Sequence, residues 1–394
     1  MVLRTIKDVS WQGKKVLLRV DYNLPQDDKG SITDDAKMRA SLPTLLYLLD
    51  AGAALIILSH LGRPKGKRNE KLTLRPMAEH LATLLEQEVN FCPDCIGEKA
   101  EQAVQQLLPG EVLLLENVRF YPEEEQNDPA FAEKIANLGD AFVNDAFATA
   151  HRAHASTVGI GRFKTAYAGL LMEEEVMTLE KVMHTIQSPR VAILGGAKIT
   201  DKLGLINSFM QLMDVIIIGG GMANSFLKAQ GYNIGKSLHE ESLLEEAAAI
   251  LEKAEAGKIQ ILLPVDVVVA DALTADAKGK TVKIDAVPAD SMIVDIGDET
   301  VEKFAASLKK AKAIVWNGPL GVYEYKQFAR GTEKIAAVVA ALDAVSVIGG
   351  GNIAAAIKDL GLSAEITHIS TGGGATLEFL EGIDLPGIAV CKED

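Results

Sequence analysis

The sequence predicts an α/β protein of two Rossmann-like domains, each a parallel sheet with helices on both faces, joined by a hinge helix. Three observations favour this architecture. In both halves of the chain, short apolar runs alternate with segments of helical period, which is typical of parallel sheets. Between the halves lies a long segment without glycine or proline. The length of 394 residues also exceeds what one hydrophobic core usually serves, which favours two domains.

The first half contains four predicted strands. Helical periodicity between them is clear over residues 42–49 and 77–85. The segment that follows, residues 170–186, carries three glutamates near its start and predicts one continuous helix. The predicted strands are residues 15–20, 53–59, 112–116 and 142–144.

The second half repeats this alternation after Pro189, with a helical segment over residues 241–254. In open parallel sheets, ligands bind at the carboxyl ends of the strands, so we expect one site in each half. The predicted strands are residues 191–194, 215–218, 259–263, 313–316, 345–348 and 367–370.

The charge balance and the lack of long apolar runs limit the partners. Forty basic residues against 54 acidic ones give a net charge of −14. Neither nucleic acid nor an anionic membrane surface is therefore an expected partner. No apolar run approaches the length of about 18 residues that a membrane span needs, and no signal peptide is evident, so we predict a cytoplasmic protein.

The cysteines give little information about function. Three cysteines are too few for a disulfide framework. Cys92 and Cys95 form one C-x-x-C pair, which a redox dithiol or a metal site would also require. No second pair accompanies them, so we interpret them as two ordinary thiols.

Residues 191–202 combine an apolar run, two glycines and two lysines four positions apart. This pattern predicts a strand, a tight turn and a helix that carries Lys198 and Lys202 on one face. Glycine-lined helix N-termini favour anions, and two ammonium groups would strengthen that preference. An ordinary strand–helix junction with two solvated lysines would have the same pattern.

Further glycine turns favour the phosphate interpretation. Backbone without side chains can approach a polyphosphate closely, so the set predicts a nucleotide site. No P-loop or dinucleotide-binding glycine motif is present. The turns after the other predicted strands are residues 219–221, 317–318, 349–351 and 372–374.

The strand ends of the first half carry histidine, arginine and other polar residues instead. Arginine binds carboxylate and phosphate through paired N–H groups, so this set predicts a pocket for a small, doubly anionic molecule. The residues are Asp21, Asn23, His60, Arg63, Arg119, His151 and Arg152.

Seven motifs, in order along nearly the whole chain, resemble those of the phosphoglycerate kinase family. They are R-V-D-Y-N-L-P at 19–25, S-H-L-G-R-P-K at 59–65, E-N-V-R-F-Y at 116–121, N-D-A-F at 144–147 with H-R-A-H at 151–154, G-G-A-K at 195–198, W-N-G-P at 316–319 and S-T-G-G-G at 370–374. The resemblance implies reversible transfer of the 1-phosphoryl group of 1,3-bisphosphoglycerate to Mg-ADP, giving 3-phosphoglycerate and ATP. It also implies hinge closure and charge stabilisation of the transferring phosphoryl group.

The resemblance further implies the domain boundaries and the roles of individual residues. Residues 1–169 with about 377–394 would bind 3-phosphoglycerate, residues 170–188 would connect, and residues 189–376 would bind ADP or ATP with Mg²⁺. The strand-end residues of the first half would hold 3-phosphoglycerate, and Lys37, Lys198 and Lys202 would act on the phosphoryl group. The implied nucleotide-binding residues are Lys198, Lys202, Gly219, Gly220, Gly221, Gly297, Asn317, Glu324, Gly350, Gly351, Asn352 and Gly373.

Two positions depart from the family pattern. The family has Arg where this chain has Lys37, and lysine keeps the charge but loses the guanidinium fork. The family has a magnesium-binding Asp where this chain has Asn352, and a neutral amide offers a hard cation one uncharged oxygen.

These departures define an alternative, a weakly active or inactive member that serves as a ligand-binding or scaffold protein. A two-domain binding protein of the periplasmic kind is a more distant alternative, disfavoured by the lysine-flanked glycine turn. For the leading hypothesis we expect a monomer.

Overall fold

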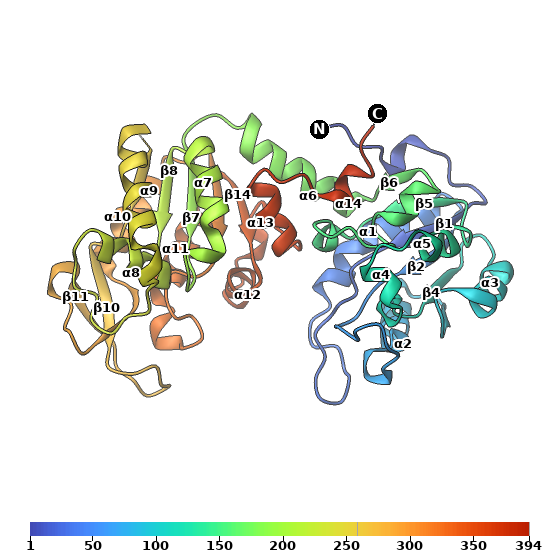
Figure 1. The fold of residues 1–394 in the computed structure, drawn as a ribbon, viewed down its shortest axis with the longest axis horizontal. Coiled ribbons are helices and arrows are strands. Elements are labelled where there is room, and N and C mark those ends of the chain that lie inside the picture. The colour runs from blue at the N-terminus through green and yellow to red at the C-terminus, as the bar shows by residue number, and fades with distance from the viewer. Residues whose placement is uncertain (258, 394) are drawn as a thin grey trace. The chain divides into compact units, whose positions relative to one another are not determined.

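The computed structural model describes residues 1–257 and 259–393. Two compact units are present, Met1–Met177 with Asp384–Asp394, and Thr178–Ile383. Each contains a six-stranded sheet accompanied by helices, so the predicted α/β architecture is confirmed (Figure 1).

The sheet of the first unit has the strand order β3-β4-β2-β1-β5-β6, and all its pairings are parallel. The four predicted strands are present, but β3 and β6 were not predicted. Both lie at sheet edges, where β3 is only partly buried and β6 has three residues, so neither produces a clear apolar run. The strands are β1 (Lys15–Arg19), β2 (Ala54–Leu58), β3 (Val89–Cys92), β4 (Val112–Leu115), β5 (Ala141–Asn144) and β6 (Ala166–Ala168).

The helices of this unit pack an apolar face on the sheet. Val16 and Leu18 of β1 lie in one buried cluster with Leu45 and Leu81 from two helices. Full burial of each such side chain contributes about 1.5–3 kcal/mol. The helices are α1 (Ala36–Asp50), α2 (Arg75–Leu85), α3 (Gly97–Gln106), α4 (Pro122–Glu125), α5 (Pro129–Ala136) and α14 (Pro386–Ala389), together with α6 (Leu170–Glu180), which begins in this unit and ends in the second.

The predicted helix over residues 170–186 is present as α6, and it ends in a wider π-helical turn, η6 (Lys181–Thr185). Short 3₁₀ turns complete the first unit. They are η1 (Ile6–Asp8), η2 (Glu70–Leu72), η3 (Val118–Phe120), η4 (Phe147–Thr149) and η5 (Gly159–Arg162).

The main sheet of the second unit has the order β15-β14-β13-β7-β8-β9, and its pairings are parallel. All six predicted strands are present. They are β7 (Arg190–Leu194), β8 (Val215–Ile218), β9 (Gln260–Leu262), β13 (Ala313–Asn317), β14 (Val345–Gly349) and β15 (His368–Ile369).

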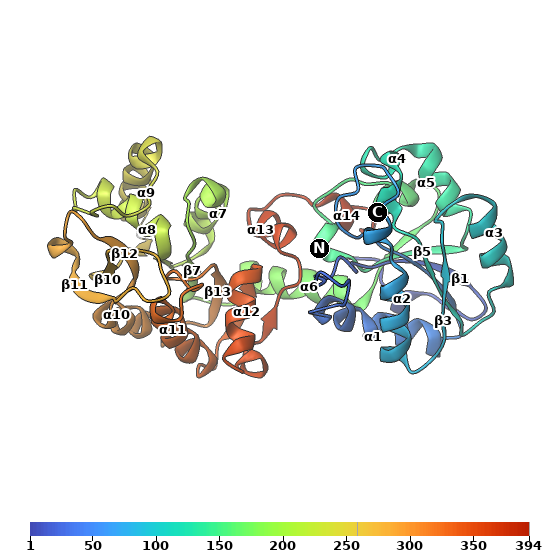
Figure 2. The same cartoon turned by 90° about the horizontal axis from the view of Figure 1, so that it is seen from below.

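An antiparallel sheet of three strands, β11-β10-β12, was not predicted (Figure 2). The residues of β11 are largely exposed, so this strand lacks an apolar signal. The strands are β10 (Asp266–Ala270), β11 (Lys280–Lys283) and β12 (Met292–Ile296).

The helices of the second unit follow the strands closely. Buried Trp316 of β13 lies in one apolar cluster with Phe304 and Ile335 from two of these helices. The helices are α7 (Leu203–Leu212), α8 (Gly220–Ala229), α9 (Leu244–Gly257), α10 (Asp298–Leu308), α11 (Arg330–Ala340), α12 (Gly351–Asp359) and α13 (Gly374–Leu380). The 3₁₀ turns are η7 (Thr200–Lys202), η8 (Glu241–Leu243), η9 (Ile284–Ala286), η10 (Lys326–Phe328) and η11 (Ser363–Glu365).

The C-terminal segment packs on the first unit, beside the N-terminus (Figure 1). Leu3 pairs with Lys392, and the Gly387 N–H donates to the carbonyl of Ala150 at 2.8 Å. The Asn144 amide donates in turn to the Gly387 carbonyl at 3.0 Å. This contact ties the end of β5 to the end of the chain. No helix within the described residues has the length and apolar character to cross a membrane.

Gly387→Ala tests this packing. An added Cβ would lie 2.7 Å from the Ala150 Cα, which is backbone and cannot move aside cheaply. We expect the free energy of unfolding to fall by about 1–3 kcal/mol in urea denaturation. Gly257→Ala is the control, because its Cβ would meet nothing closer than 3.7 Å and should leave stability unchanged or raised. Equal stability of the Gly387 variant and the wild type would contradict this packing.

Candidate functional site

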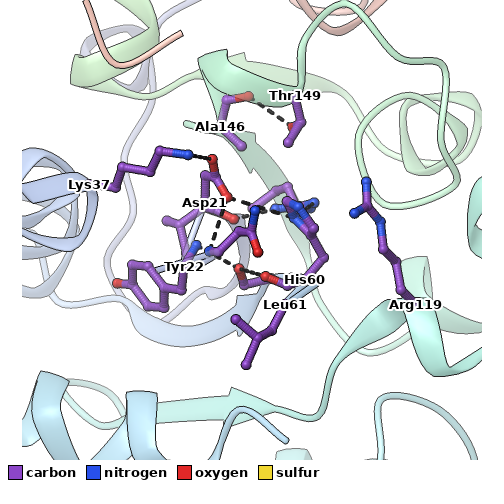
Figure 3. Close-up of polar contacts among 12 residues, drawn as sticks. Asp21, Tyr22, Lys37, His60, Leu61, Arg119, Ala146 and Thr149 are labelled. Carbon is purple, nitrogen blue, oxygen red and sulfur yellow. Dashed lines mark hydrogen bonds and ion pairs between the residues drawn. The ribbon is translucent and has the colours of Figure 1, made fainter. Parts of the chain in front are cut away.

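The carboxyl ends of β1 and β2 bring two predicted site residues together. The strands are parallel neighbours with Arg19 opposite Leu58, so Asp21 and His60 follow them at the same edge. Lys37, in the first turn of α1, donates to Asp21 Oδ2 at 2.7 Å. Figure 3 shows Asp21 between Lys37 and His60.

Beneath these residues, a buried network links a carboxylate to the site. Glu124 accepts at 2.6 Å from the Ser156 hydroxyl and at 2.9 Å from the Ser156 N–H. Ser156 Oγ accepts in turn from Arg19 Nε at 2.8 Å. Glu124, Ser156 and Arg19 are all fully buried. Burial raises the pKa of Glu124, although the charge of Arg19 opposes this shift.

Arg19 also sets the state of His60. Its Nη2 lies 3.2 Å from His60 Nδ1, and because arginine can only donate, Nδ1 accepts and the ring is neutral. Burial holds the pKa of His60 well below its usual value. The 3.8 Å approach of His60 to Asp21 is therefore not an ion pair at neutral pH.

Arg119 has two buried donor nitrogens without a hydrogen-bond acceptor among the described residues. Its Nη1 donates to the Gly62 carbonyl at 2.9 Å, and Nε lies 3.4 Å from Glu125. Nε and Nη2 are both buried, and neither has a hydrogen-bond partner among the described residues. Burial lowers the pKa of Arg119 to about 10, and the charges of Arg19 and Arg152 act in the same direction. A buried N–H without an acceptor costs about 1–3 kcal/mol, which a bound anion would recover.

The remaining predicted residues of this half lie around that group. Arg152, half-buried, donates from Nε to His151 Nε2 at 3.1 Å. Asn23 accepts from the Gly62 N–H at 2.8 Å, so it holds the loop that carries the exposed Arg63.

Three network members were missed by sequence reasoning: Arg19, Glu124 and Ser156. A signal for Arg19 exists, because a charged residue ends an otherwise apolar strand. We name the basic set Arg19, His60, Arg119, Arg152 and His154 the carboxyl-end cluster. Burial also lowers the pKa of His154 to about 4, with a further contribution from the cluster's arginines.

The second unit contains a cavity of about 690 Å³. Its wall includes the apolar side chains of Leu227, Leu238 and Val322. Of the predicted nucleotide-binding residues, four line this cavity: Gly220, Gly221, Glu324 and Asn352.

The other predicted residues lie at neighbouring strand ends or helix starts. Gly219 follows β8, Gly297 follows β12, Asn317 ends β13, Gly350 and Gly351 lie where α12 begins, and Gly373 precedes α13. Glycine is required at Gly195, where a Cβ would lie 2.0 Å from the Pro319 carbonyl oxygen. Strand ends β7 and β13 therefore approach each other closely.

The lysine turn, residues 195–202, differs from the prediction. The α-helix begins only at Leu203, so Lys198 and Lys202 do not share one face of a helix. The backbone groups are also already bonded within the protein. The Ile199 and Thr200 N–H groups donate to Glu240, and Gly196 N–H donates to the Pro319 carbonyl at 2.9 Å. A carboxylate thus takes the place predicted for phosphate on these N–H groups.

The two lysines differ in environment. Lys198 is exposed, whereas the Lys202 ammonium donates to the carbonyls of Gly195 at 2.6 Å and Asn317 at 3.1 Å. Burial lowers the pKa of Lys202 to about 8. Asn317 also donates to the Gly349 carbonyl at 2.6 Å, so three strand ends meet at this point.

Protein ligands for a metal ion are few. No group of three or more His, Cys, Asp or Glu side chains suited to a metal occurs within residues 1–257 and 259–393. Asn352 is exposed at the cavity wall and offers one amide oxygen. Cys92 and Cys95 are free and buried, and burial raises the pKa of both thiols.

Comparison with known proteins decides the family. The family model described as phosphoglycerate kinase matches residues 6–383. The chain belongs to the phosphoglycerate kinase family. The resemblance of the seven motifs is thereby confirmed, and with it the assignment as a phosphotransferase that has a carboxyl group as acceptor. The family uses a nucleotide substrate and 3-phosphoglycerate or 1,3-bisphosphoglycerate.

Similar proteins cover the whole chain. Phosphoglycerate kinase of Pelotomaculum thermopropionicum is 50% identical over 98% of each chain, and that of Moorella thermoacetica is 50% identical over 100% of each. Among solved structures, phosphoglycerate kinase from Coxiella burnetii is 41% identical with a TM-score of 0.91, covering 99% of this chain and 98% of that one. The enzyme from Pyrococcus horikoshii is 36% identical with a TM-score of 0.86 and the same coverage.

The lowered pKa of Lys202 predicts a pH effect. The ammonium is present below about pH 8 and is lost as the pH rises through that value. If only the charged form holds phosphate, the apparent KM for Mg-ATP rises about tenfold between pH 7 and pH 9. The KM for 3-phosphoglycerate should change by less than about twofold over the same range. Steady-state kinetics of Lys202→Arg, whose guanidinium stays charged, should show a flat profile, and the same rise in that variant would contradict the assignment to Lys202.

Proposed function

We propose that the carboxyl-end cluster with Asp21, Asn23 and Arg63 binds 3-phosphoglycerate, and that the cavity with the lysine turn binds Mg-ADP or Mg-ATP. The observation that carries the first assignment is the unpartnered Nη2 of buried Arg119. A protein with net charge −14 that buries two arginines, Arg19 and Arg119, at one sheet edge has a local receptor for an anion.

In the first unit, some of the proposed residues would bind the ligand through their charge and others through hydrogen bonds. Arg63, Arg119 and Arg152 supply guanidinium groups for phosphate, and neutral His60 supplies a donor at Nε2. Asp21 suits a hydroxyl group of the glycerate, because its carboxylate can only accept. Asn23 and His151 complete the proposed set.

In the second unit, the apolar walls of the cavity suit a purine base, and exposed Glu324 suits the ribose hydroxyls. Lys198 and Lys202 suit the phosphates. The backbone at Gly219, Gly297, Gly350, Gly351 and Gly373 allows close approach, and Asn317 holds the strand ends.

In the proposed site, magnesium is bound together with the nucleotide. Mg²⁺ keeps several waters and is bound through phosphates and one or two carboxylates in many such sites. Here Asn352 is the proposed protein ligand, and its uncharged oxygen adds little attraction. We therefore propose that the phosphates hold the metal and that Asn352 only orients it.

Phosphoryl transfer needs positioning and charge stabilisation more than covalent help. The attacking carboxylate or phosphate oxygen is already anionic, so no side chain acts as a nucleophile. Lys37 and Lys198 are the proposed charges beside the transferring group. Hinge closure, which the family resemblance implies, stays a prediction, as do the monomeric state and the cytoplasmic location.

The alternative of a weakly active binding protein depends on Lys37 and Asn352. Lys37 is paired with Asp21, which offsets part of its charge. Arg39 does not replace the missing guanidinium, because its Nε is paired with Asp35 at 2.9 Å and its side chain is 58% exposed. Lysine at position 37 keeps a positive charge and Asn352 keeps one oxygen ligand, and none of the three comparisons supports the alternative.

A coupled assay of ATP-dependent 3-phosphoglycerate phosphorylation, with a magnesium titration, tests the proposal. We expect turnover by the wild type. Lys37→Arg should raise kcat about threefold to tenfold through the restored guanidinium fork. Asn352→Asp should lower the magnesium concentration for half-maximal rate about tenfold, because a carboxylate adds charge. Tight binding of both substrates without turnover, with activity only in the double variant, would favour the binding-protein alternative.

A further inference from the structure

Glu240 lies about 40 positions from the lysine turn in sequence, yet its carboxylate is bonded to the middle of that turn. Oε2 accepts from the N–H groups of Ile199 and Thr200, the latter at 3.1 Å. Oε1 accepts from the Thr200 hydroxyl. Both oxygens are therefore engaged between Lys198 and Lys202.

The segment that presents this carboxylate is itself tied to regular structure. We call residues 237–240 the strap. The Glu240 N–H donates to Ser225 Oγ at 3.0 Å, and Asn224 donates to the Leu238 carbonyl at 2.9 Å, so α8 holds one side. Ser237 Oγ accepts from the Ile293 N–H of β12 at 2.8 Å. A carboxylate supported in this way can hold a turn in one geometry.

Charge indicates how Glu240 acts. Burial would raise the pKa of Glu240, but hydrogen bonds from Thr200 and Ile199 and the charge of Lys198 outweigh it, and the pKa is lowered. The group is therefore ionised at neutral pH. A carboxylate would repel a polyphosphate in direct contact, so its effect must pass through the turn that it holds.

The strap also reaches the cavity, because Leu238 is part of the cavity wall. One short segment thus contacts the space proposed for the base and the turn proposed for the phosphates. We propose that Glu240 is a positioning residue for phosphoryl transfer, holding the lysine turn so that Lys198 and Lys202 meet the nucleotide phosphates. This inference rests on the proposed nucleotide site. Misplacement of a charged group by about 1 Å can lower a rate about a hundredfold.

Glu240→Gln is the central variant, because the amide keeps the shape but loses the charge and one acceptor. We expect kcat/KM for Mg-ATP to fall about tenfold or more, with the KM for 3-phosphoglycerate within about twofold of wild type. The unfolding temperature should change little, since the strap keeps its bonds to α8 and β12. Glu241→Gln is the matched control, because the Glu241 carboxylate contacts the side chains of Lys228 and His239 instead. We expect wild-type kinetics from this control.

A double-mutant cycle with Thr200→Val shows whether Glu240 acts through the turn. If it does, Glu240→Gln with Thr200→Val is little worse than Glu240→Gln alone, and Thr200→Ser stays close to wild type. Three results would overturn the proposal. The losses in kcat/KM could be additive in the double variant, the Glu240 and Glu241 variants could have equal kinetics, or kcat/KM could fall in parallel for both substrates and follow the unfolding temperature.

Calorimetric titration of Mg-ADP distinguishes failure of the proposed function from failure of the role of Glu240. A wild type that neither binds Mg-ADP nor turns over contradicts the proposed function, whereas an active wild type with an unaffected Glu240→Gln contradicts only the role of Glu240.

Discussion

The buried contact of Arg19 with Ser156, and through it with Glu124, is the interaction on which the first unit's site depends. It brings the buried Glu124 carboxyl group close to Arg19, and the opposite charge of this group offsets the cost of burying the Arg19 guanidinium. Arg19 then requires an acceptor at His60 Nδ1, which keeps that ring neutral and leaves its other nitrogen as a donor. Arg119 has no comparable buried acceptor for Nη2 within the described residues. The network therefore offsets the positive charge of Arg19 and leaves the free donors of Arg119 available to a ligand.

In the second unit, backbone groups serve as the partners of the charged side chains. The Lys202 ammonium is held by two carbonyls at the ends of β7 and β13, and the Glu240 carboxylate is held by two N–H groups of the same turn. Glycines at the strand ends allow these approaches, because a side chain at Gly195 would overlap the Pro319 carbonyl. The geometry of the strand ends therefore sets the positions of the Lys202 ammonium and the Glu240 carboxylate. A small shift of the lysine turn would change how strongly its lysines interact with a phosphate.

Much of the fold could be predicted from the sequence, because buried parallel strands produce apolar runs and their order sets which strand ends meet. This is why Asp21 and His60 could be expected together. The exposed strand β11 and the short edge strand β6 carry no such signal. The support from Glu124 and Glu240 could not be predicted either, because each contact joins segments that are 32 and 41 positions apart in sequence. The spacing of the two lysines in the sequence also does not show that the Lys202 ammonium donates to backbone carbonyl groups.

We infer that the first unit buries positive charge in order to bind an anion, and that this burial lowers the stability of the unit when no anion is bound. Isothermal titration calorimetry of Arg119→Met, which keeps most of the buried volume, tests this most directly. We expect the affinity of this variant for 3-phosphoglycerate to fall at least about tenfold, its affinity for Mg-ADP to stay unchanged, and its unfolding temperature to stay unchanged or rise. Unchanged 3-phosphoglycerate affinity, or an equal loss for both ligands, would contradict it.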